Sequence, residues 1–448
     1  MIDGRPAAAP RAAPPMPENA GLAGAKPGTA FSPVTSTSPS DRHRMTPLER
    51  RASGSLALVF AARMLGLFLV LPVFALEAAR YPGGDDPAWI GLAMGIYGLT
   101  QGVLQIPYGT ASDRFGRKRV IIIGLAVFAI ASFIAAAAHS LGWLIVGRSL
   151  QGAGAVSAAV TALLADQTRD EVRTKAMAMV GASIGLMFAL SLVAAPLLAG
   201  VGGLPLLFTL TGLLALACMA VVAWWTPPEP AEHKPSGRPS GGLGLVLRHS
   251  GLLRLDVGVF VLHAVQLAMW VAIPALLVQA GLEKDRHWTV YLPTVLASFV
   301  VMALTLFPLE RRGYLRAVFL ASVGLLTLVQ LALALLAGRP SVAMLAMVLF
   351  LFFCAFNVLE ASQPSMASRL APPQARGAAL GVYNTLQSLG FFAGGAVGGW
   401  LTKHVGAQGL FAFCAGLTFL WLVVAWPMAA PGRSPSPEEV LADEAQAT

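Results

Sequence analysis

Apolar runs of about twenty residues recur along nearly the whole 448-residue chain, and they restrict its fold more than any other feature. A helix needs about twenty apolar residues to cross the roughly 30 Å hydrocarbon core of a bilayer. Because a spanning backbone must satisfy its hydrogen bonds internally, these runs predict an all-α membrane protein. Twelve transmembrane helices are expected, at residues 53–78, 88–110, 118–138, 141–166, 173–200, 203–226, 253–280, 287–309, 314–337, 341–369, 376–402 and 406–429.

The composition supports a lipid environment. Apolar residues make up 56% of the chain and charged residues 12%, against about a quarter charged in soluble domains. Cys218, Cys354 and Cys414 all lie within apolar runs and have no metal-ligand spacing. We therefore expect neither a disulfide framework nor a metal site, and no cofactor.

The distribution of basic residues predicts the orientation. Lys and Arg gather in the N-terminal segment and in alternate connections between the apolar runs. This asymmetry is the positive-inside pattern, and with an even number of crossings it places both termini in the cytoplasm. The net charge of +9 is not concentrated on one face, so a nucleic-acid partner is not indicated.

A Pro/Gly/Ser-rich stretch between the sixth and seventh runs divides the chain into two halves of six helices each. The N-terminal residues 1–52 lack apolar runs and are expected to be disordered, and Met45 is a candidate translation start. The expected organisation is 1–52 N-terminal segment, 53–226 first half, 227–252 linker, 253–429 second half and 430–448 tail.

The most specific motif is G-T-A-S-D-R-F-G-R-K, in the connection between the second and third helices. Its glycines permit close packing and a tight turn, and its acid and cations can form ion pairs. Simple positive-inside anchors would need neither an acid nor two glycines at fixed spacing. We therefore interpret the motif as a charged gate that includes Gly109, Asp113, Arg114, Gly116, Arg117 and Lys118.

This motif resembles the loop signature of the major facilitator superfamily. The resemblance implies that Asp113 faces the start of the eleventh helix and that Arg117 pairs with an acid ending the fourth helix, where Asp166 lies. R-S-L-Q-G-A-G-A, from Arg148, resembles a second motif of the family. Antiporters of the family carry a Gly-Pro in the fifth helix, whereas this chain has Ala195 before Pro196.

A closer resemblance covers Met45 to about residue 429. M-T-P-L-E-R-R, R-M-L-G-L-F-L-V-L-P-V and F-N-V-L-E are similar to the YajR branch of bacterial inner-membrane efflux transporters. The resemblance implies a multi-pass protein of the inner membrane. The C-terminal soluble domain of that branch is not expected here, because the chain ends within about twenty residues of the last predicted helix.

Ionisable residues within predicted spans are candidates for proton coupling. They fall on the first, fourth, seventh and tenth helices, which line the central cavity in the superfamily: Arg63, Arg148, Asp256, His263 and Glu360. His263 and Glu360 are each nine residues from an arginine at the expected interface, which predicts a similar depth for both. A histidine beside a carboxylate can exchange a proton near neutral pH.

Structural roles explain some of these residues equally well. Arg148 could orient helices, His263 could bond a neighbouring helix, and Glu360 could accept bonds from Asn357. Asp256 follows Arg254 closely and is expected at the interface. Cavity lining and interhelical hydrogen bonding are both open for the polar residues Gln101, Gln105, Gln151, Gln266, Asn357, Asn384 and Gln387.

The leading functional hypothesis is proton-coupled efflux, by antiport, of amphipathic or drug-like small molecules. Uptake or facilitated diffusion of a polar nutrient is the alternative within transport, and a non-transporting membrane enzyme or scaffold is the alternative outside it. No nucleotide-binding loop or nucleophile constellation is found in the sequence, so enzymatic activity is not predicted. The expected partners are the small-molecule substrate, protons and the lipid bilayer, and the expected state is a monomer.

Overall fold

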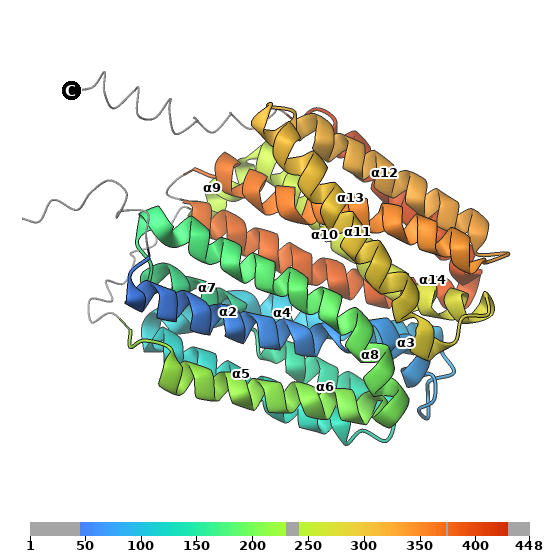
Figure 1. Ribbon diagram of the computed structural model, residues 1–448, viewed down its shortest axis with the longest axis horizontal. Helices are drawn as coiled ribbons and strands as arrows, with labels where there is room; N and C mark the ends of the chain where they lie inside the picture. Colours follow the sequence, from blue (N-terminus) through green and yellow to red (C-terminus); the bar gives the residue numbers. More distant parts are fainter. Residues whose placement is uncertain (1–44, 230–241, 373–374, 429–448) are drawn as a thin grey trace, which may run out of the picture. The chain divides into compact units, whose positions relative to one another are not determined.

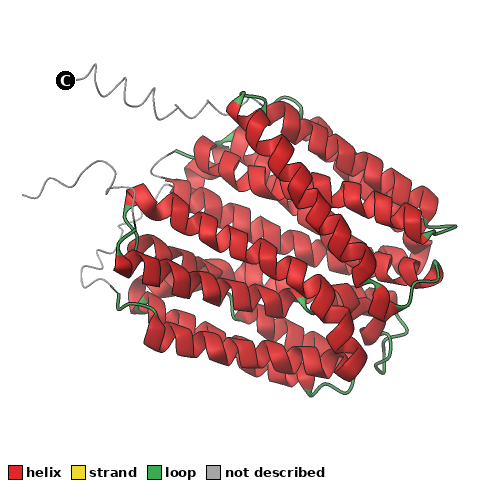
Figure 2. Cartoon of the chain, in the orientation of Figure 1, coloured by secondary structure: helices red, strands yellow, loops and turns green. Residues whose placement is uncertain are grey.

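The computed structural model describes residues 45–229, 242–372 and 375–428. All the described residues belong to one compact unit. Every regular element in the described ranges is a helix (Figure 2). The predicted all-α class is confirmed.

The first half is built from long helices, of which the first and fourth spans are each divided in two. Its elements are α2 (Pro47–Phe68), α3 (Leu71–Ala78), α4 (Pro87–Phe115), α5 (Arg117–Ala136), α6 (Leu141–Ala153), α7 (Ser157–Asp166), α8 (Asp170–Ala220) and the π-helical turn η1 (Val221–Trp225). Gly203 has a φ of 59°, a value that favours glycine, and α8 changes direction there, so that it supplies both the fifth and the sixth span.

The second half follows the same plan. Its elements are α9 (Gly242–Arg248), α10 (Ser250–Gln279), the 3₁₀ turn η2 (Lys284–Arg286), α11 (Trp288–Arg311), α12 (Leu315–Leu336), α13 (Val342–Leu370) and α14 (Arg376–Ala425). Gly406, with a φ of 68°, divides α14 into the last two spans. Figure 1 shows the two halves side by side, with α4 and α14 between them.

Eight of the described helical segments are long and apolar enough to cross a membrane. Two of these contain the turns at Gly203 and Gly406 and provide two spans each. The remaining two expected spans correspond to α4 and to α6 with α7. The chain is therefore a membrane protein of twelve helices in two halves, as the sequence predicts.

Two predicted boundaries are wrong. Residues 47–52, assigned to a disordered segment, form the first turns of α2, because Thr46 and Glu49 make a reciprocal capping box. The linker predicted at 227–252 contains α9, and α10 already begins at Ser250. The expectations for residues 1–44, 230–241 and 429–448 fall outside the described residues.

Glycines on both helices bring α4 and α14 into close contact along the seam between the halves. A Cβ added to Gly95 would lie 2.7 Å from the carbonyl oxygen of Phe392, and one added to Gly395 would lie 2.7 Å from the Gly95 nitrogen. Additions at Gly91 and Gly399 would overlap the opposite backbone as well. Small residues thus allow the backbones to approach as membrane helix pairs require.

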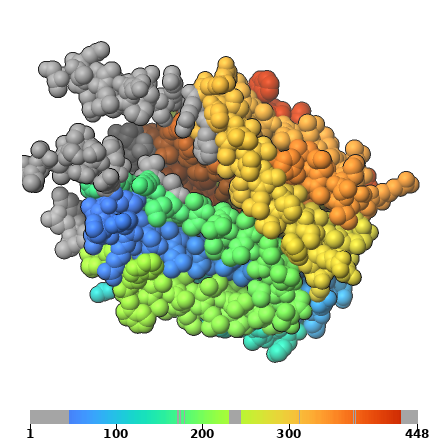
Figure 3. All heavy atoms as spheres, in the orientation of Figure 1, coloured from blue at the N-terminus to red at the C-terminus, as the bar shows by residue number. Residues whose placement is uncertain are grey.

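Helix α10 is the most enclosed span. Of its most apolar stretch 89% is buried, because α3, α4, α13 and α14 all pack against it. We use the term basic end for the end of the bundle that carries Arg114, Arg117, Lys118 and Arg119. Figure 3 shows a recess between the first half, in blue and green, and yellow α11, which opens toward this end. Asn384, on α14, is exposed.

We predict that Gly95→Val destabilises the protein, because its side chain would force α4 away from α14. Overpacking of this kind costs about 1–3 kcal/mol. Gly181→Val is the matched control, since no atom lies within 4 Å of a Cβ at that position. Thermal unfolding of the purified protein measures the difference, and equal melting of the two variants would contradict the seam.

Candidate functional site

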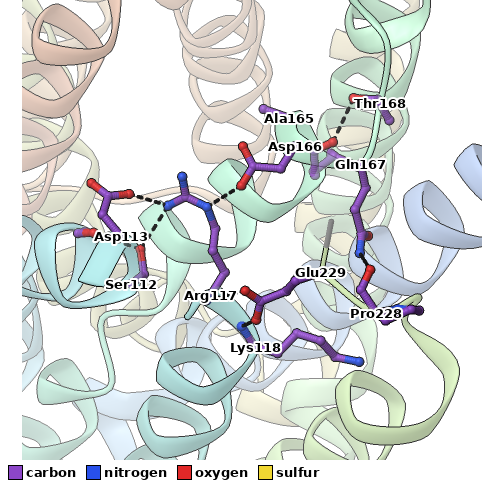
Figure 4. A network of polar contacts seen from close by, with 12 residues as sticks. Ser112, Asp113, Arg117, Lys118, Ala165, Asp166, Gln167, Thr168, Pro228 and Glu229 are labelled. Atoms are coloured by element: carbon purple, nitrogen blue, oxygen red, sulfur yellow. Dashed lines mark hydrogen bonds and ion pairs between the residues drawn. The ribbon is translucent and has the colours of Figure 1, made fainter. Parts of the chain in front are cut away.

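The predicted gate residues converge at the basic end. Arg117 lies between two acids, with Nη1 2.6 Å from Asp113 Oδ1 and Nε 2.5 Å from Asp166 Oδ2 (Figure 4). Nη1 also donates to Ser112 Oγ at 3.1 Å. Arg117 is only 8% exposed, so most of its charge is compensated by these contacts. One guanidinium therefore connects the end of α4 with the end of α7.

The other motif residues shape this connection. Gly116 has a φ of 95° and separates α4 from α5, which fits the predicted tight turn. The Gly109 carbonyl accepts a hydrogen bond from Ser112 Oγ, and Lys118 Nζ donates to the Thr226 carbonyl. Arg114 is exposed and lies over the Phe115 ring. The expected approach of Asp113 to the eleventh helix involves residues 373–376, part of which are outside the described residues.

Glu229, which the sequence analysis missed, closes the network from the linker. Its carboxylate accepts the backbone N–H of Lys118 at 2.6 Å and that of Arg117 at 3.2 Å (Figure 4). An acid at a helix N-terminus satisfies free N–H groups and is favoured by the helix dipole. The start of the linker is therefore attached directly to the gate. The only available signal was an acid just after the sixth helix.

A second set of ion pairs joins the two halves at the opposite end, and we call it the latch. The Glu77 carboxylate accepts hydrogen bonds from Lys284 Nζ at 2.6 Å and from Arg80 Nη1 at 3.2 Å. In a second pair, Lys403 Nζ lies 2.5 Å from Asp86 Oδ2. Glu77 is only 4% exposed, so the ion pair with Lys284 is largely shielded from water. The latch could not be predicted, since its partners are far apart in the chain.

Asp86 shows how the latch depends on pH. The ammonium group of Lys403 and the N–H of Ala88 hold the pKa of Asp86 below its ordinary value. A carboxylate with a lowered pKa contributes its stabilisation above the ordinary pKa and loses it as the pH falls through the lowered one. The Asp86–Lys403 pair therefore stays intact at neutral pH and weakens only in acid.

The predicted His263–Glu360 pair is present near the centre of the bundle. His263 Nε2 lies 3.2 Å from Glu360 Oε2, and Gln387 Nε2 lies 2.8 Å from the same histidine nitrogen. His263 Nδ1 is 2.9 Å from the Val259 carbonyl, which assigns the hydrogen of the neutral ring to Nδ1. Nε2 then accepts a hydrogen bond from Gln387 Nε2. Only a second proton would allow it to donate to Glu360.

Asp256 does not belong to this contact. It was expected at the interface, but it is only 3% exposed, and its Oδ2 has no hydrogen-bond partner among the described residues. Its helix is enclosed on all sides, which explains the error.

The two predicted arginines lie within the first half rather than beside Glu360. Arg63 Nη2 donates to Tyr97 Oη at 2.9 Å, and Arg148 lies over the Tyr97 ring at 5.0 Å. Arg148 also donates to Gln151 at 2.9 Å. Both arginines are nearly fully buried. These contacts fit a role in fixing helix positions better than one beside His263 and Glu360.

The polar residues for which cavity lining and interhelical hydrogen bonding were both open differ in their contacts. Gln101 connects Arg63 with Ser388 of the second half, at 3.5 and 3.4 Å. Asn357 donates to Ser298 at 2.7 Å, so the suggested bond to Glu360 is replaced by one to α11. Three of the others form hydrogen bonds with a neighbouring side chain: Gln105 with Ser157, Gln151 with Ser132, and Gln387 with Glu360. Asn384 is exposed, and Gln266 Oε1 has no partner among the described residues.

Comparison with known proteins identifies the family. The sequence profile of the Major Facilitator Superfamily matches residues 56–309 and 308–447. The inner membrane transport protein YajR of Escherichia coli K12 is 41% identical over 410 residues, which is 90% of each chain. The chain belongs to the major facilitator superfamily. It is thus a secondary transporter and not an enzyme.

Two further similarities extend this result. The multidrug resistance protein MdtH of Aeromonas salmonicida is 28% identical over 373 residues, or 79% of this chain and 88% of that protein. A bacterial homologue of the human lysosomal transporter Spinster, in an inward-facing and occupied conformation, has a TM-score of 0.67 at 14% identity. It covers 88% of this chain and all of that one, and it supports the superfamily fold.

For the gate, we predict that Asp113→Asn abolishes transport and leaves membrane insertion intact. The amide keeps the shape of the side chain but loses the charge that pairs with Arg117. Because a hydrogen bond to a charged group contributes about 1.5–3 kcal/mol, we expect at least a roughly tenfold loss of transport rate. Transport by the purified protein in reconstituted vesicles measures the rate, and exposed Asp85→Asn is the control. Normal transport by Asp113→Asn would refute a gate role.

For the latch, we predict that Lys284→Gln shifts the protein away from the conformation open at the basic end. The reporter is Asn384→Cys, labelled by a polar maleimide, because the three native cysteines are buried. Loss of a partly exposed pair, about 1 kcal/mol, should slow labelling roughly fivefold. Arg286→Gln, at an exposed position, is the control. Unchanged labelling in Lys284→Gln would show that the latch does not hold this conformation.

Proposed function

We propose that this transporter is a proton-coupled antiporter that exports amphipathic molecules across the bacterial inner membrane. Its basic end and both termini face the cytoplasm, in keeping with the positive-inside pattern. The chain acts as a monomer. The recess toward the basic end then corresponds to an inward-facing state, in which the latch closes the outer side.

The observation that carries the proposal is the competition for His263 Nε2. Gln387 requires this nitrogen to be an acceptor, whereas Glu360 requires it to carry a proton. When Nε2 carries a proton, His263 on α10 can bond Glu360 on α13. When Nε2 carries none, His263 bonds Gln387 on α14. All three helices belong to the second half, so a proton that changes these bonds can bias the conformational equilibrium of the transporter.

The exposure of the pair suits proton exchange. The His263 side chain is 2% exposed, while the Glu360 side chain is 40% exposed. The carboxyl group can thus meet water in the state shown, and the imidazole is shielded from it.

Aromatic residues around the pair favour amphipathic cargo. Phe391 and Phe356 lie edge-on to the His263 ring at 4.9 and 6.1 Å. Phe188 of the first half contacts Phe353 of the second at 6.2 Å. A narrow apolar gap is lined by Met269, Trp270, Ile273, Leu349, Phe352 and Phe353. Such walls bind apolar bodies and leave a few polar groups to orient them.

The relatives support the same function. One named relative is a multidrug resistance protein, and another is an inner membrane transport protein. The Ala195-Pro196 pair departs from the antiporter pattern of the fifth helix. This departure changes one position of α8 and leaves the central pair untouched.

We predict that Glu360→Gln abolishes proton-driven accumulation but retains binding of the dye ethidium. The amide cannot change its protonation, while its shape and its contact with Gln387 are kept. His263→Ala should reduce accumulation less, because the carboxyl group can still exchange a proton. Everted membrane vesicles with an imposed pH gradient measure ethidium accumulation, and ethidium fluorescence anisotropy measures binding.

Glu283→Gln, at a side chain 74% exposed, is the control and should accumulate ethidium as the wild type does. If active transport by Glu360→Gln kept its normal pH dependence, Glu360 would be excluded as the proton carrier. Accumulation in right-side-out rather than everted vesicles would instead indicate uptake.

A further inference from the structure

A shallow apolar groove lies on the outer surface of the first half, near the basic end. Its volume is about 260 Å³, and its walls come from α5 and from the last turns of the sixth span, which pack against each other. Although all its lining residues are apolar, Leu216 is 45% and Trp224 is 80% exposed. Exposed apolar surface on a membrane-spanning helix faces lipid chains rather than water. The lining residues are Ile122, Leu216, Met219, Ala220, Ala223 and Trp224.

Two cations hold the end of the sixth span beside this groove. The span ends in the π-helical turn η1, and the last carbonyls of any helix lack partners within it. Arg51 on α2 donates from Nε to the Trp225 carbonyl at 2.7 Å and from Nη2 to the Trp224 carbonyl at 3.3 Å. Lys118 Nζ on α5 donates to the Thr226 carbonyl at 2.9 Å. Both cations are therefore fixed at the end of the groove that Trp224 lines.

These cations keep donors that the helix end does not use. Arg51 Nη1 forms no hydrogen bond with a described residue, and only one of the three N–H groups of the Lys118 ammonium is used. Arg119, the next residue on α5, is exposed. The carboxylate of Glu229 is bonded to two backbone N–H groups of α5, and the two acids of the gate pair with Arg117. The end of the groove thus carries more positive than negative charge.

The depth of the groove matches that of a phospholipid. Ile122 lies five residues beyond the start of α5, about 7.5 Å along the helix axis, and each headgroup layer is about 5–7 Å thick. Leu216 lies eight residues before Trp224, so the groove continues about 12 Å toward the middle of the bilayer. Cations at the headgroup level and an apolar wall below them fit a phosphate group and an acyl chain.

We propose that this groove binds one anionic phospholipid of the leaflet at the basic end, whatever substrate the protein transports. The phosphate accepts hydrogen bonds from Arg51 and Lys118, and one acyl chain lies along Leu216 and Trp224. Guanidinium and ammonium groups are common partners of phosphate, and basic pockets between membrane helices bind anionic head groups. Interfacial anchoring explains an exposed tryptophan or arginine taken singly. It does not explain a groove whose basic end is built by side chains from two other helices.

The test uses the tryptophan of the groove as the reporter. Full-length protein is reconstituted into phosphatidylcholine vesicles with increasing shares of either phosphatidylglycerol or phosphatidylcholine that carries brominated acyl chains, because bromine quenches tryptophan fluorescence on contact. The contribution of Trp224 is the difference between the wild type and Trp224→Phe. We expect half-maximal quenching of Trp224 at a mole fraction of the brominated anionic lipid roughly fivefold lower than that of the brominated neutral lipid.

Arg51→Gln should remove most of this preference, and Arg51→Lys, which keeps the charge, should retain it. Arg119→Gln, at an exposed position, replaces Arg51→Gln if that variant fails to fold. Arg312→Gln, at an exposed arginine of the second half just after α11, is the matched control and should behave as the wild type does.

Equal quenching of Trp224 by the two lipids, or quenching by neither, would overturn the site. A preference that survives Arg51→Gln, or its replacement Arg119→Gln, would overturn it as well. So would an equal loss in Arg312→Gln, since the charge of the whole surface would then attract the lipid.

Discussion

The exclusion of water from the bilayer interior is the constraint on which the other features depend. Every backbone group within the hydrocarbon must be bonded inside the protein, which leaves helices as the building element of this chain. The same constraint makes each charged side chain within a span costly unless a partner accompanies it. Three such side chains are accordingly buried against a partner of opposite or complementary charge: Arg117 against Asp166, Glu77 against Lys284, and His263 against Glu360.

The charged contacts are arranged at three levels with different partners. The gate at the basic end joins α4, α5 and α7 with the linker and lies within the first half. The latch at the opposite end joins the two halves. The central cluster lies within the second half. Of these three, only the latch would have to separate for the opposite end to open, so it is the contact most directly linked to alternating access.

Much of this organisation could be predicted from the sequence, for identifiable reasons. Span positions follow from apolar runs, and the Arg117–Asp166 pair follows from the resemblance of the loop motif to the family signature. The His263–Glu360 contact was predicted from depth, because depth in a membrane can be counted along a helix from a charged boundary. The latch and Glu229 could not be predicted in this way, since their partners are brought together only by the packing of distant segments. The position of Asp256 was predicted wrongly, because nearness to an arginine in the sequence indicates depth in the membrane but not how closely other helices pack around the residue.

The glycine seam between α4 and α14 has a consequence for the speed of conformational exchange. Where two helices meet through interlocked side chains, relative rotation requires many rotamers to change together, and this raises the barrier. At Gly91, Gly95, Gly395 and Gly399 the contact is backbone against backbone, with no side chain to reorganise. The halves can thus roll along this line at little enthalpic cost. The ion pairs of the latch, rather than this seam, are then the contacts between the halves that must break during exchange.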